Sequence, residues 1–449
     1  MSGIGLGVVL VLMVILIMVA TGRWKADAFL LLVACAFLFG IAAGMDIEKT
    51  LETIKTGFGN TLGGVGLVII FGAIIGVFLE RTGASASIAN SMIRAVGKKR
   101  TPLALSLTGF IVSIPVFCDS GFIVLVPLAR ALARKAAAGR LALAVCLATG
   151  LYATHCLVPP TPGPIAAAEV LGADIGRVIM LGLPLALLLA LVGNLWSLRF
   201  AAEKLPDELA ETGSKAESPE ETVEEKTPGA VKSMLPILVP LLLITLGSLA
   251  KIEGGIFGSG TVASLIRGAG HPVFALAAGL ALSFPLAGPV SPRRKWIAAG
   301  VKSCAMVLAV TAAGGAFGQV IRSSELGSTL QQVLGGWKAG VLVPFMLAAA
   351  LKSAQGSSTV AMITSAAIVV PLLEPLGLGT AGWGPALAVA AIGCGSMTVS
   401  HANDSYFWVV SQMAGIPVPT AYRVYTTATG LMGVTGALGC LLLAAVLLP

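Results

Sequence analysis

Apolar runs about as long as a bilayer is thick recur along the whole chain. A helix of about 20 apolar residues spans the hydrocarbon core of a membrane. Charged residues make up only 11% of the 449 positions, fewer than the surface of a soluble domain needs. The sequence therefore predicts an all-α polytopic membrane protein surrounded by lipid bilayer. Ten crossings are expected, at 4–20, 26–44, 62–80, 141–158, 178–198, 234–250, 272–288, 303–321, 385–400 and 424–448.

A charged segment divides these runs into two groups of five. Residues 203–232 hold nine of the 21 acidic residues, with Ser, Thr and Pro between them. This composition cannot bury a core, so it predicts a solvated linker. We expect a first membrane repeat at 1–202, an acidic linker at 203–232 and a second membrane repeat at 233–449.

The two halves match each other weakly at an offset of about 242 to 246 residues, a pattern typical of chains with internal structural repeats. Five crossings are an odd number, so the second unit must enter the membrane from the opposite side. The sequence therefore predicts an inverted repeat. Matching positions include Pro102 with Pro344, Thr154-His155 with Ser400-His401, and Gly193 with Gly439.

The basic residues indicate the orientation. With the N-terminus outside, 21 of the 29 Lys and Arg residues face the cytoplasm and 8 face outward, as the positive-inside rule requires. Both termini are then periplasmic and the linker is cytoplasmic. The basic residues do not cluster with aromatic ones, so the formal charge of +8 does not indicate a nucleic-acid partner.

Polar residues interrupt four of the apolar segments. The stretches 102–134 and 340–373 are too short to cross twice and are broken near 117–121 and 355–359, so we expect two re-entrant hairpins. The following crossings are broken at Pro159-Pro160-Thr161-Pro162-Gly163-Pro164 and at His401-Ala402-Asn403-Asp404-Ser405. Irregular backbone at membrane depth persists only where protein or a wet cavity satisfies it. We therefore expect the four breaks to converge on one site.

Two aspartates lie in these breaks, Asp119 in the first hairpin and Asp404 in the second broken crossing. An ionisable group inside a membrane segment is costly, so its default interpretation is functional. Desolvation would make such a carboxylate a usable proton carrier. The alternative is a carboxylate that only caps the helix after the break. We favour proton coupling for both aspartates and leave Glu169 open.

His155 and His401 occupy equivalent places in the repeat, each directly after a hydroxyl residue. An imidazole can relay protons near neutral pH, or it can remain neutral and hydrogen-bond unwound backbone, and both interpretations stay open. The seven cysteines form no CxxC pair, so neither a disulfide framework nor a metal site is expected. No cofactor is expected either.

No Lys or Arg lies inside a break, although Lys352 comes within three residues of one. A bound anion would therefore be held by free N–H groups and the positive ends of broken helices, which suits a small hydroxylated carboxylate. Gly72 and Gly76, in the third crossing, are expected to serve helix packing. The candidate substrate-binding residues are Ser120, Gly121, Thr161, Gly163, Gly356, Ser357, Ser358, Thr359, Asn403 and Ser405.

Two other function classes fit less well. A channel would show charge rings or a repeated filter motif, whereas paired broken helices in an inverted repeat favour a carrier. An enzyme could use Ser, His and Asp, but no G-x-S-x-G motif occurs in the chain. The sequence predicts a carrier without enzymatic activity.

The residues at the four breaks resemble those of the gluconate permease family of bacterial proton symporters. The resemblance covers nearly the whole chain, although the acidic linker is longer than the family leads us to expect. It is carried by Phe117-Cys118-Asp119-Ser120-Gly121, by Thr154-His155-Cys156-Leu157-Val158-Pro159-Pro160-Thr161-Pro162-Gly163-Pro164, by Gln355-Gly356-Ser357-Ser358-Thr359-Val360-Ala361 and by Ser400-His401-Ala402-Asn403-Asp404-Ser405-Tyr406-Phe407-Trp408.

This resemblance implies an inner-membrane carrier that imports gluconate or a related sugar acid with protons. Relatives carry other small hydroxy acids and D-serine, so the family does not fix the substrate. It also implies an elevator motion, often in a homodimer. Sodium coupling is the nearest alternative, because hydroxyls and carbonyls of broken helices can also hold Na⁺.

Overall fold

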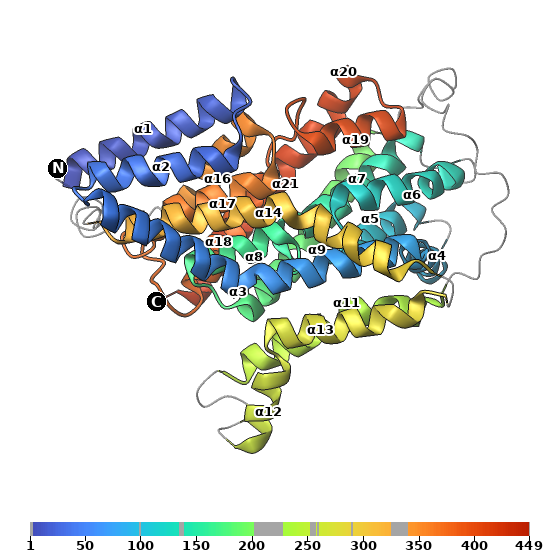
Figure 1. Ribbon diagram of the computed structural model, residues 1–449. Helices are drawn as coiled ribbons and strands as arrows, with labels where there is room; N and C mark the ends of the chain where they lie inside the picture. The colour runs from blue at the N-terminus through green and yellow to red at the C-terminus, as the bar shows by residue number, and fades with distance from the viewer. Residues whose placement is uncertain are drawn as a thin grey trace.

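The computed structural model describes residues 3–97, 100–133, 139–201, 228–251, 257, 260–288, 291–324 and 340–448. Helices and no strand occur in these ranges (Figure 1), which confirms the predicted all-α class. Most of the predicted linker at 203–232 lies outside the described residues. Its last three residues are helical, because a helix begins at Ala230.

The described helices fall on both sides of the linker. Before the linker they are α1 (Gly3–Gly22), α2 (Ala28–Ala42), α3 (Ile47–Arg81), α4 (Ala84–Val96), α5 (Thr101–Val112), α6 (Cys118–Ala133), α7 (Arg140–Leu157), α8 (Pro162–Leu171) and α9 (Ile175–Phe200). After it they are α11 (Ala230–Leu249), α12 (Thr261–Ala269), α13 (Pro272–Ser283), α14 (Arg293–Arg322), α16 (Leu342–Gln355), α17 (Ser358–Val369), α18 (Gly384–Met397), α19 (Ser405–Ala414), α20 (Val418–Ala421) and α21 (Thr427–Leu447).

Six described helical segments are long and apolar enough to cross a membrane, and a seventh would be the pair α12 and α13, which is bent by 62°. The predicted runs 4–20, 26–44 and 385–400 fall on the shorter apolar helices α1, α2 and α18. The six long segments are Ile47–Arg81, Arg140–Leu171, Ile175–Phe200, Ala230–Leu249, Arg293–Arg322 and Val418–Leu447. They coincide with six of the ten predicted crossings.

Aspartates begin three of the helices. The side chains of Asp27, Asp46 and Asp174 accept hydrogen bonds of 3.1, 2.7 and 3.0 Å from backbone N–H groups in the first turns of α2, α3 and α9. Such capping satisfies donors that a helix start leaves unpaired. These carboxylates therefore have a structural role at helix ends.

Helices α7 and α18 form the centre of the bundle. Residues 141–157 of α7 and every residue of α18 are buried. Large apolar side chains are instead exposed on outer helices, for example Leu195 of α9 at 66% and Leu442 of α21 at 71%. An apolar exterior around a packed helical centre is the arrangement that lipid requires.

The two halves pack in corresponding ways. The long helices α3 and α14 lie along each other, α5 packs on α7 as α16 packs on α18, and α6 meets α19 as α17 meets α8. In Figure 1 both chain ends lie at the same end of the bundle, and α12 projects from its body. The packing therefore brings the ends of the broken helices of one half against those of the other.

Candidate functional site

The four predicted breaks are present in the structure. Helix α6 begins at Cys118 after a turn at 113–117, and Gly356 and Ser357 separate α16 from α17. Residues 158–161 separate α7 from α8, and residues 398–404 separate α18 from α19. Four half-helices therefore begin at breaks, and their first turns carry unpaired N–H groups and partial positive charge.

The strongest polar contact at these breaks is a buried ion pair. The ammonium nitrogen Nζ of Lys352 lies 2.7 Å from Oδ2 of Asp404, and the two side chains are 0% and 4% exposed. Lys352 also donates a hydrogen bond to the carbonyl of Gly356 and lies 5.8 Å from the ring centroid of Tyr152. A buried charge is tolerated only when it is paired and hydrogen-bonded, as this one is.

Asp404 also begins α19. Its Oδ1 accepts a 3.1 Å hydrogen bond from the backbone N–H of Tyr406. Its Oδ2 accepts hydrogen bonds from Ser400 and, at 3.4 Å, from the hydroxyl of Tyr152. The capping interpretation of Asp404 is therefore correct, and it holds together with the ion pair.

Asp119 has a different environment. It lies in the first turn of α6, and its buried Oδ1 has no hydrogen-bond partner in the part of the chain that the structure describes. Its carboxylate interacts electrostatically with Asp404 and Lys352. Asp119 is thus the less satisfied of the two predicted aspartates, although both lie in one electrostatic group.

The two predicted histidines differ in their contacts. His155, in the last turn of α7, is 5% exposed, and its Nδ1 has no partner among the described residues. His155 interacts electrostatically with Asp404 and Lys352, so we name Lys352, Asp404, Asp119 and His155 the charged cluster. His401 instead places Nε2 3.2 Å from the carbonyl oxygen of Ser353, which fits a hydrogen bond to backbone.

The end of α16 and the residues before α19 are joined by hydrogen bonds. Asn403 donates from Nδ2 to the carbonyl of Ser353 at 2.6 Å. Gly356 has a φ of +90°, and a Cβ there would meet the carbonyl of Asn403, so only glycine allows this approach. Ser357 caps α17 through a 3.3 Å bond from the N–H of Val360. Ser357 and Ser405 are exposed, so the structure does not bury them with the charged cluster.

The first broken crossing meets the second hairpin along α8 and α17. Gly163 of α8 packs against Thr359 and Met362 of α17, and Ser358 of α17 interacts with Cys156 of α7. The donors Gly163, Ser358 and Thr359 therefore lie at one interface. On α6, Gly121 is buried against Leu151, and Ser120 is half-buried beside Asp119.

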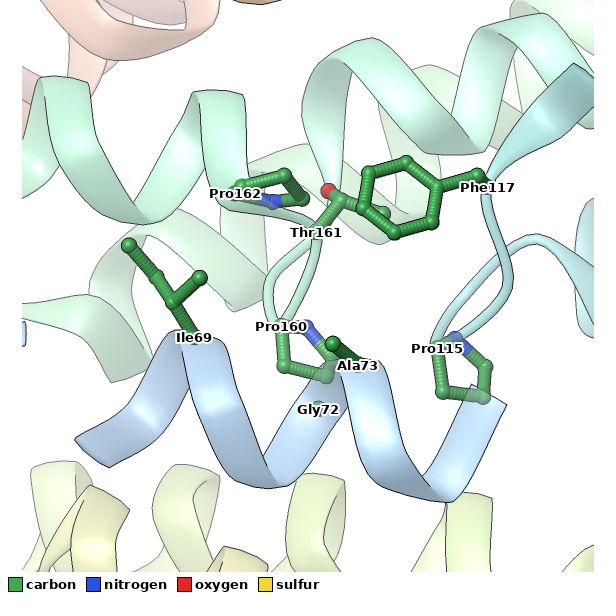
Figure 2. Close-up of a pocket in the computed structure, with 8 residues that line it drawn as sticks. All are labelled: Ile69, Gly72, Ala73, Pro115, Phe117, Pro160, Thr161 and Pro162. Atoms are coloured by element: carbon green, nitrogen blue, oxygen red, sulfur yellow. The ribbon is translucent and has the colours of Figure 1, made fainter. Parts of the chain in front are cut away.

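Thr161 lines a small pocket between α3 and the two breaks of the first half. Its hydroxyl donates to the carbonyl of Val158 at 2.6 Å. Figure 2 shows the pocket between Pro160, Thr161 and Phe117 on one side and Ile69 and Gly72 of α3 on the other. Its volume of about 10 Å³ is room for a single water.

Two glycines of α3 face broken backbone. A Cβ on Gly72 would lie 3.3 Å from Pro160, and a Cβ on Gly76 would lie 2.6 Å from the carbonyl oxygen of Pro115. The predicted packing role of this glycine pair is therefore confirmed. Helix α3 supports both breaks of the first half because it has no side chain at these two positions.

Gly76→Ala should lower the free energy of unfolding by about 1–3 kcal/mol, the usual cost of overpacking, because the contacted atom is backbone and cannot rotate away. The matched control is Gly59→Ala on the same helix, where no described atom lies within 4 Å of the added Cβ. Unfolding in detergent with increasing denaturant measures both. Equal effects of the two substitutions would refute the packing role.

Sequence reasoning overlooked two residues. In the sequence Lys352 lies outside the break, yet it belongs to the last turn of α16, where it meets Asp404. The available signal was a lone lysine in an apolar hairpin. Gln355 ends α16, and its buried Oε1 and Nε2 have no partner among the described residues. The sequence places Gln355 in the break, but Gln355 is not among the predicted substrate-binding residues.

A bundle of apolar helices whose centre holds broken helices and a buried charged cluster defines the class of membrane transport proteins. Comparison with known proteins then assigns the family. The sequence pattern of the GntP family permease matches residues 5–446, and the chain belongs to this family. It is accordingly a multi-pass permease of the inner membrane, not an enzyme.

Curated relatives agree with this assignment. An uncharacterized permease of Haemophilus influenzae is 36% identical over 408 residues, which cover 88% of this chain and 83% of the relative. A gluconate permease of Pseudomonas aeruginosa is 32% identical, with 95% and 94% covered. The D-serine transporter DsdX of Escherichia coli is also 32% identical, with 94% of each covered.

A solved structure has the same fold. The YdaH transporter of Alcanivorax borkumensis superimposes with a TM-score of 0.63 at 16% identity, over 94% of this chain and 98% of that one. Its likeness extends over both halves of the bundle.

Proposed function

We propose that this permease imports gluconate or a related small hydroxy-carboxylate together with protons. Gluconate-type permeases take small organic anions, and relatives of this chain are a gluconate permease and a D-serine transporter. The observation that carries the proposal is the charged cluster. It combines a fixed cation suited to a carboxylate, Lys352, with a carboxylate suited to a proton, Asp119, whose buried Oδ1 has no partner among the described residues.

Charge balance supports coupling to one proton per monovalent substrate. In the charged cluster Lys352 contributes one positive charge, Asp119 and Asp404 contribute two negative charges, and a neutral His155 contributes none. Without substrate the cluster therefore carries one net negative charge. A proton on Asp119 and a bound monoanion leave that net charge unchanged. Moving an uncompensated anion inward would instead cost about 2.3 kcal/mol per 100 mV. The charged cluster can then cross the membrane at the same electrical cost with its substrate and proton as without them.

The substrate-binding part of the proposal uses the first turns of the half-helices. The substrate carboxylate lies near Lys352 and the N–H groups that begin α17. The substrate hydroxyls meet Gly163, Ser358 and Thr359 where α8 packs on α17, and Thr161 in the break before α8. Further donors lie on the first turns of α6 and α19, in the second hairpin and in the break before α19, at Ser120, Gly121, Gly356, Ser357, Asn403 and Ser405. His155 and His401 support proton movement beside them.

The proposed mechanism is alternating access by an inverted repeat. The pairs α5–α6 and α16–α17 act as re-entrant hairpins from opposite faces, and both termini are periplasmic with a cytoplasmic linker at 203–232. The corresponding packing of the two halves and the excess of basic residues on one side support this arrangement. The family resemblance implies that the permease acts as a homodimer, and this is part of the same proposal.

Reconstitution in liposomes tests the function. Labelled gluconate should accumulate under an inward proton gradient in sodium-free buffer, and a protonophore should abolish the accumulation. Uptake that needs added sodium would favour a sodium-coupled carrier, and flux without accumulation would favour a channel. Gluconate, idonate and D-serine as competitors would then rank the substrates.

A further inference from the structure

A second polar cavity lies away from the charged cluster, between α3, α8 and α14. It has a volume of about 120 Å³. Its polar lining comes from Asn60 and Thr61 on α3, Glu169 on α8, and Gln319 and Arg322 on α14. Of these five residues, Glu169 is the one whose role the sequence leaves open. The central site uses none of the five.

Glycines create this cavity. A Cβ on Gly57 of α3 would lie 2.8 Å from the carbonyl oxygen of Gly315 on α14, so the two helices approach backbone to backbone at the cavity. The carboxylate of Glu169 on α8 lies against Gly64 of α3. Gly57, Gly315 and Gly318 line the cavity together with the polar side chains.

The charges in the cavity hold α8 against α14. The guanidinium of Arg322 donates to the carbonyl of Val170 and interacts electrostatically with Glu169. A guanidinium offers five N–H donors, and this carbonyl uses one of them. Arg322 can therefore bind an oxyanion while it keeps its hydrogen bond to the carbonyl of Val170 on α8.

The cavity lies at the outer end of α14 under the proposed orientation. That helix begins with Arg293, Arg294 and Lys295 and ends at Arg322, and the basic end is expected to face the cytoplasm. Helix α8 connects the cavity to the central donors, because Glu169 is six residues from Gly163 along the chain, about 9 Å in a helix.

We propose that this cavity is an outer binding site, where the hydroxy-carboxylate is held before it reaches the charged cluster. Arg322 pairs with the carboxylate, and Asn60, Thr61, Gln319 and Glu169 hydrogen-bond the hydroxyl groups. The substrate class rests on the proposed function. The site itself rests on the cavity and its residues.

The test compares Arg322→Gln with the control Arg267→Gln, which removes the same charge from α12 on the same predicted face, outside the cavity. Loss of one charge-assisted bond should raise the half-saturating gluconate concentration for inward uptake about tenfold. The maximal rate and the half-saturating concentration for efflux from the opposite side should stay unchanged. Arg267→Gln should match the wild type.

Asn60→Leu provides a second variant if Arg322→Gln does not fold, because Asn60 is exposed on α3 and a leucine would fill the cavity. The same rise in half-saturation is expected. A lower maximal rate with unchanged half-saturation would show that the Glu169–Arg322 pair acts as a gate and would overturn the proposal. If Arg322→Gln and Asn60→Leu had the same half-saturating concentration as Arg267→Gln, the proposal would also be overturned. Absence of gluconate uptake by the wild type would instead count against the proposed function.

Direct binding separates the two sites. Labelled gluconate should still bind weakly to the full-length Lys352→Met protein in detergent, and a further Arg322→Gln substitution should abolish that binding. Identical binding by the single and double variants would contradict an outer site.

Discussion

Lys352→Met should abolish gluconate uptake and lower the free energy of unfolding by about 3–5 kcal/mol, the cost of leaving one partner of a buried ion pair uncompensated. Lys352 is fully buried, and its ammonium group lies 2.7 Å from Asp404. Uptake into liposomes and denaturant unfolding in detergent measure the two effects. The loss of uptake is expected because the variant has no buried cation for the substrate carboxylate.

Two controls separate binding from stability. The double variant Lys352→Met with Asp404→Asn removes both charges, so it should recover most of the lost stability without recovering uptake. Lys55→Met breaks the exposed pair with Glu52, whose atoms lie 3.2 Å apart, and should change the unfolding free energy by less than about 1 kcal/mol. Transport restored by the double variant would show that Lys352 only compensates Asp404.

Asp119→Asn should abolish proton-driven accumulation while leaving exchange of labelled for unlabelled gluconate. The amide cannot carry a proton across, but it keeps the shape of the buried side chain in the first turn of α6. With one proton per substrate, a pH difference of one unit is worth about 1.4 kcal/mol and drives about tenfold accumulation. The variant should only equilibrate the labelled substrate.

Asp27→Asn is the matched control for this charge change. Asp27 caps α2 through an exposed hydrogen bond of 3.1 Å, and asparagine caps helices about as well. Its accumulation should therefore equal that of the wild type. Full gradient-driven accumulation by Asp119→Asn would exclude Asp119 as the essential proton carrier.

The helical architecture and the position of the breaks could be predicted from the sequence. Apolar length and the polar residues that interrupt it are local properties, so the breaks around Pro160 and Asn403 were visible in the sequence alone. The helix starts at Asp27, Asp46 and Asp174 follow from the same local chemistry. The buried position of Asp404 and the half-buried position of Asp119 were also predictable, because each lies within an otherwise apolar segment.

The partners of these residues depended on the tertiary structure. Asp119 and Asp404 look alike in the chain, yet among the described residues Lys352 forms its ion pair with Asp404 and not with Asp119, because α16 packs beside the start of α19. The cavity at Arg322 likewise exists only where Gly57 and Gly315 bring α3 and α14 together. Local composition specifies which segments enter the membrane and where they break. Long-range packing decides which buried charges are paired, because the pairing residues lie on helices that are distant in sequence.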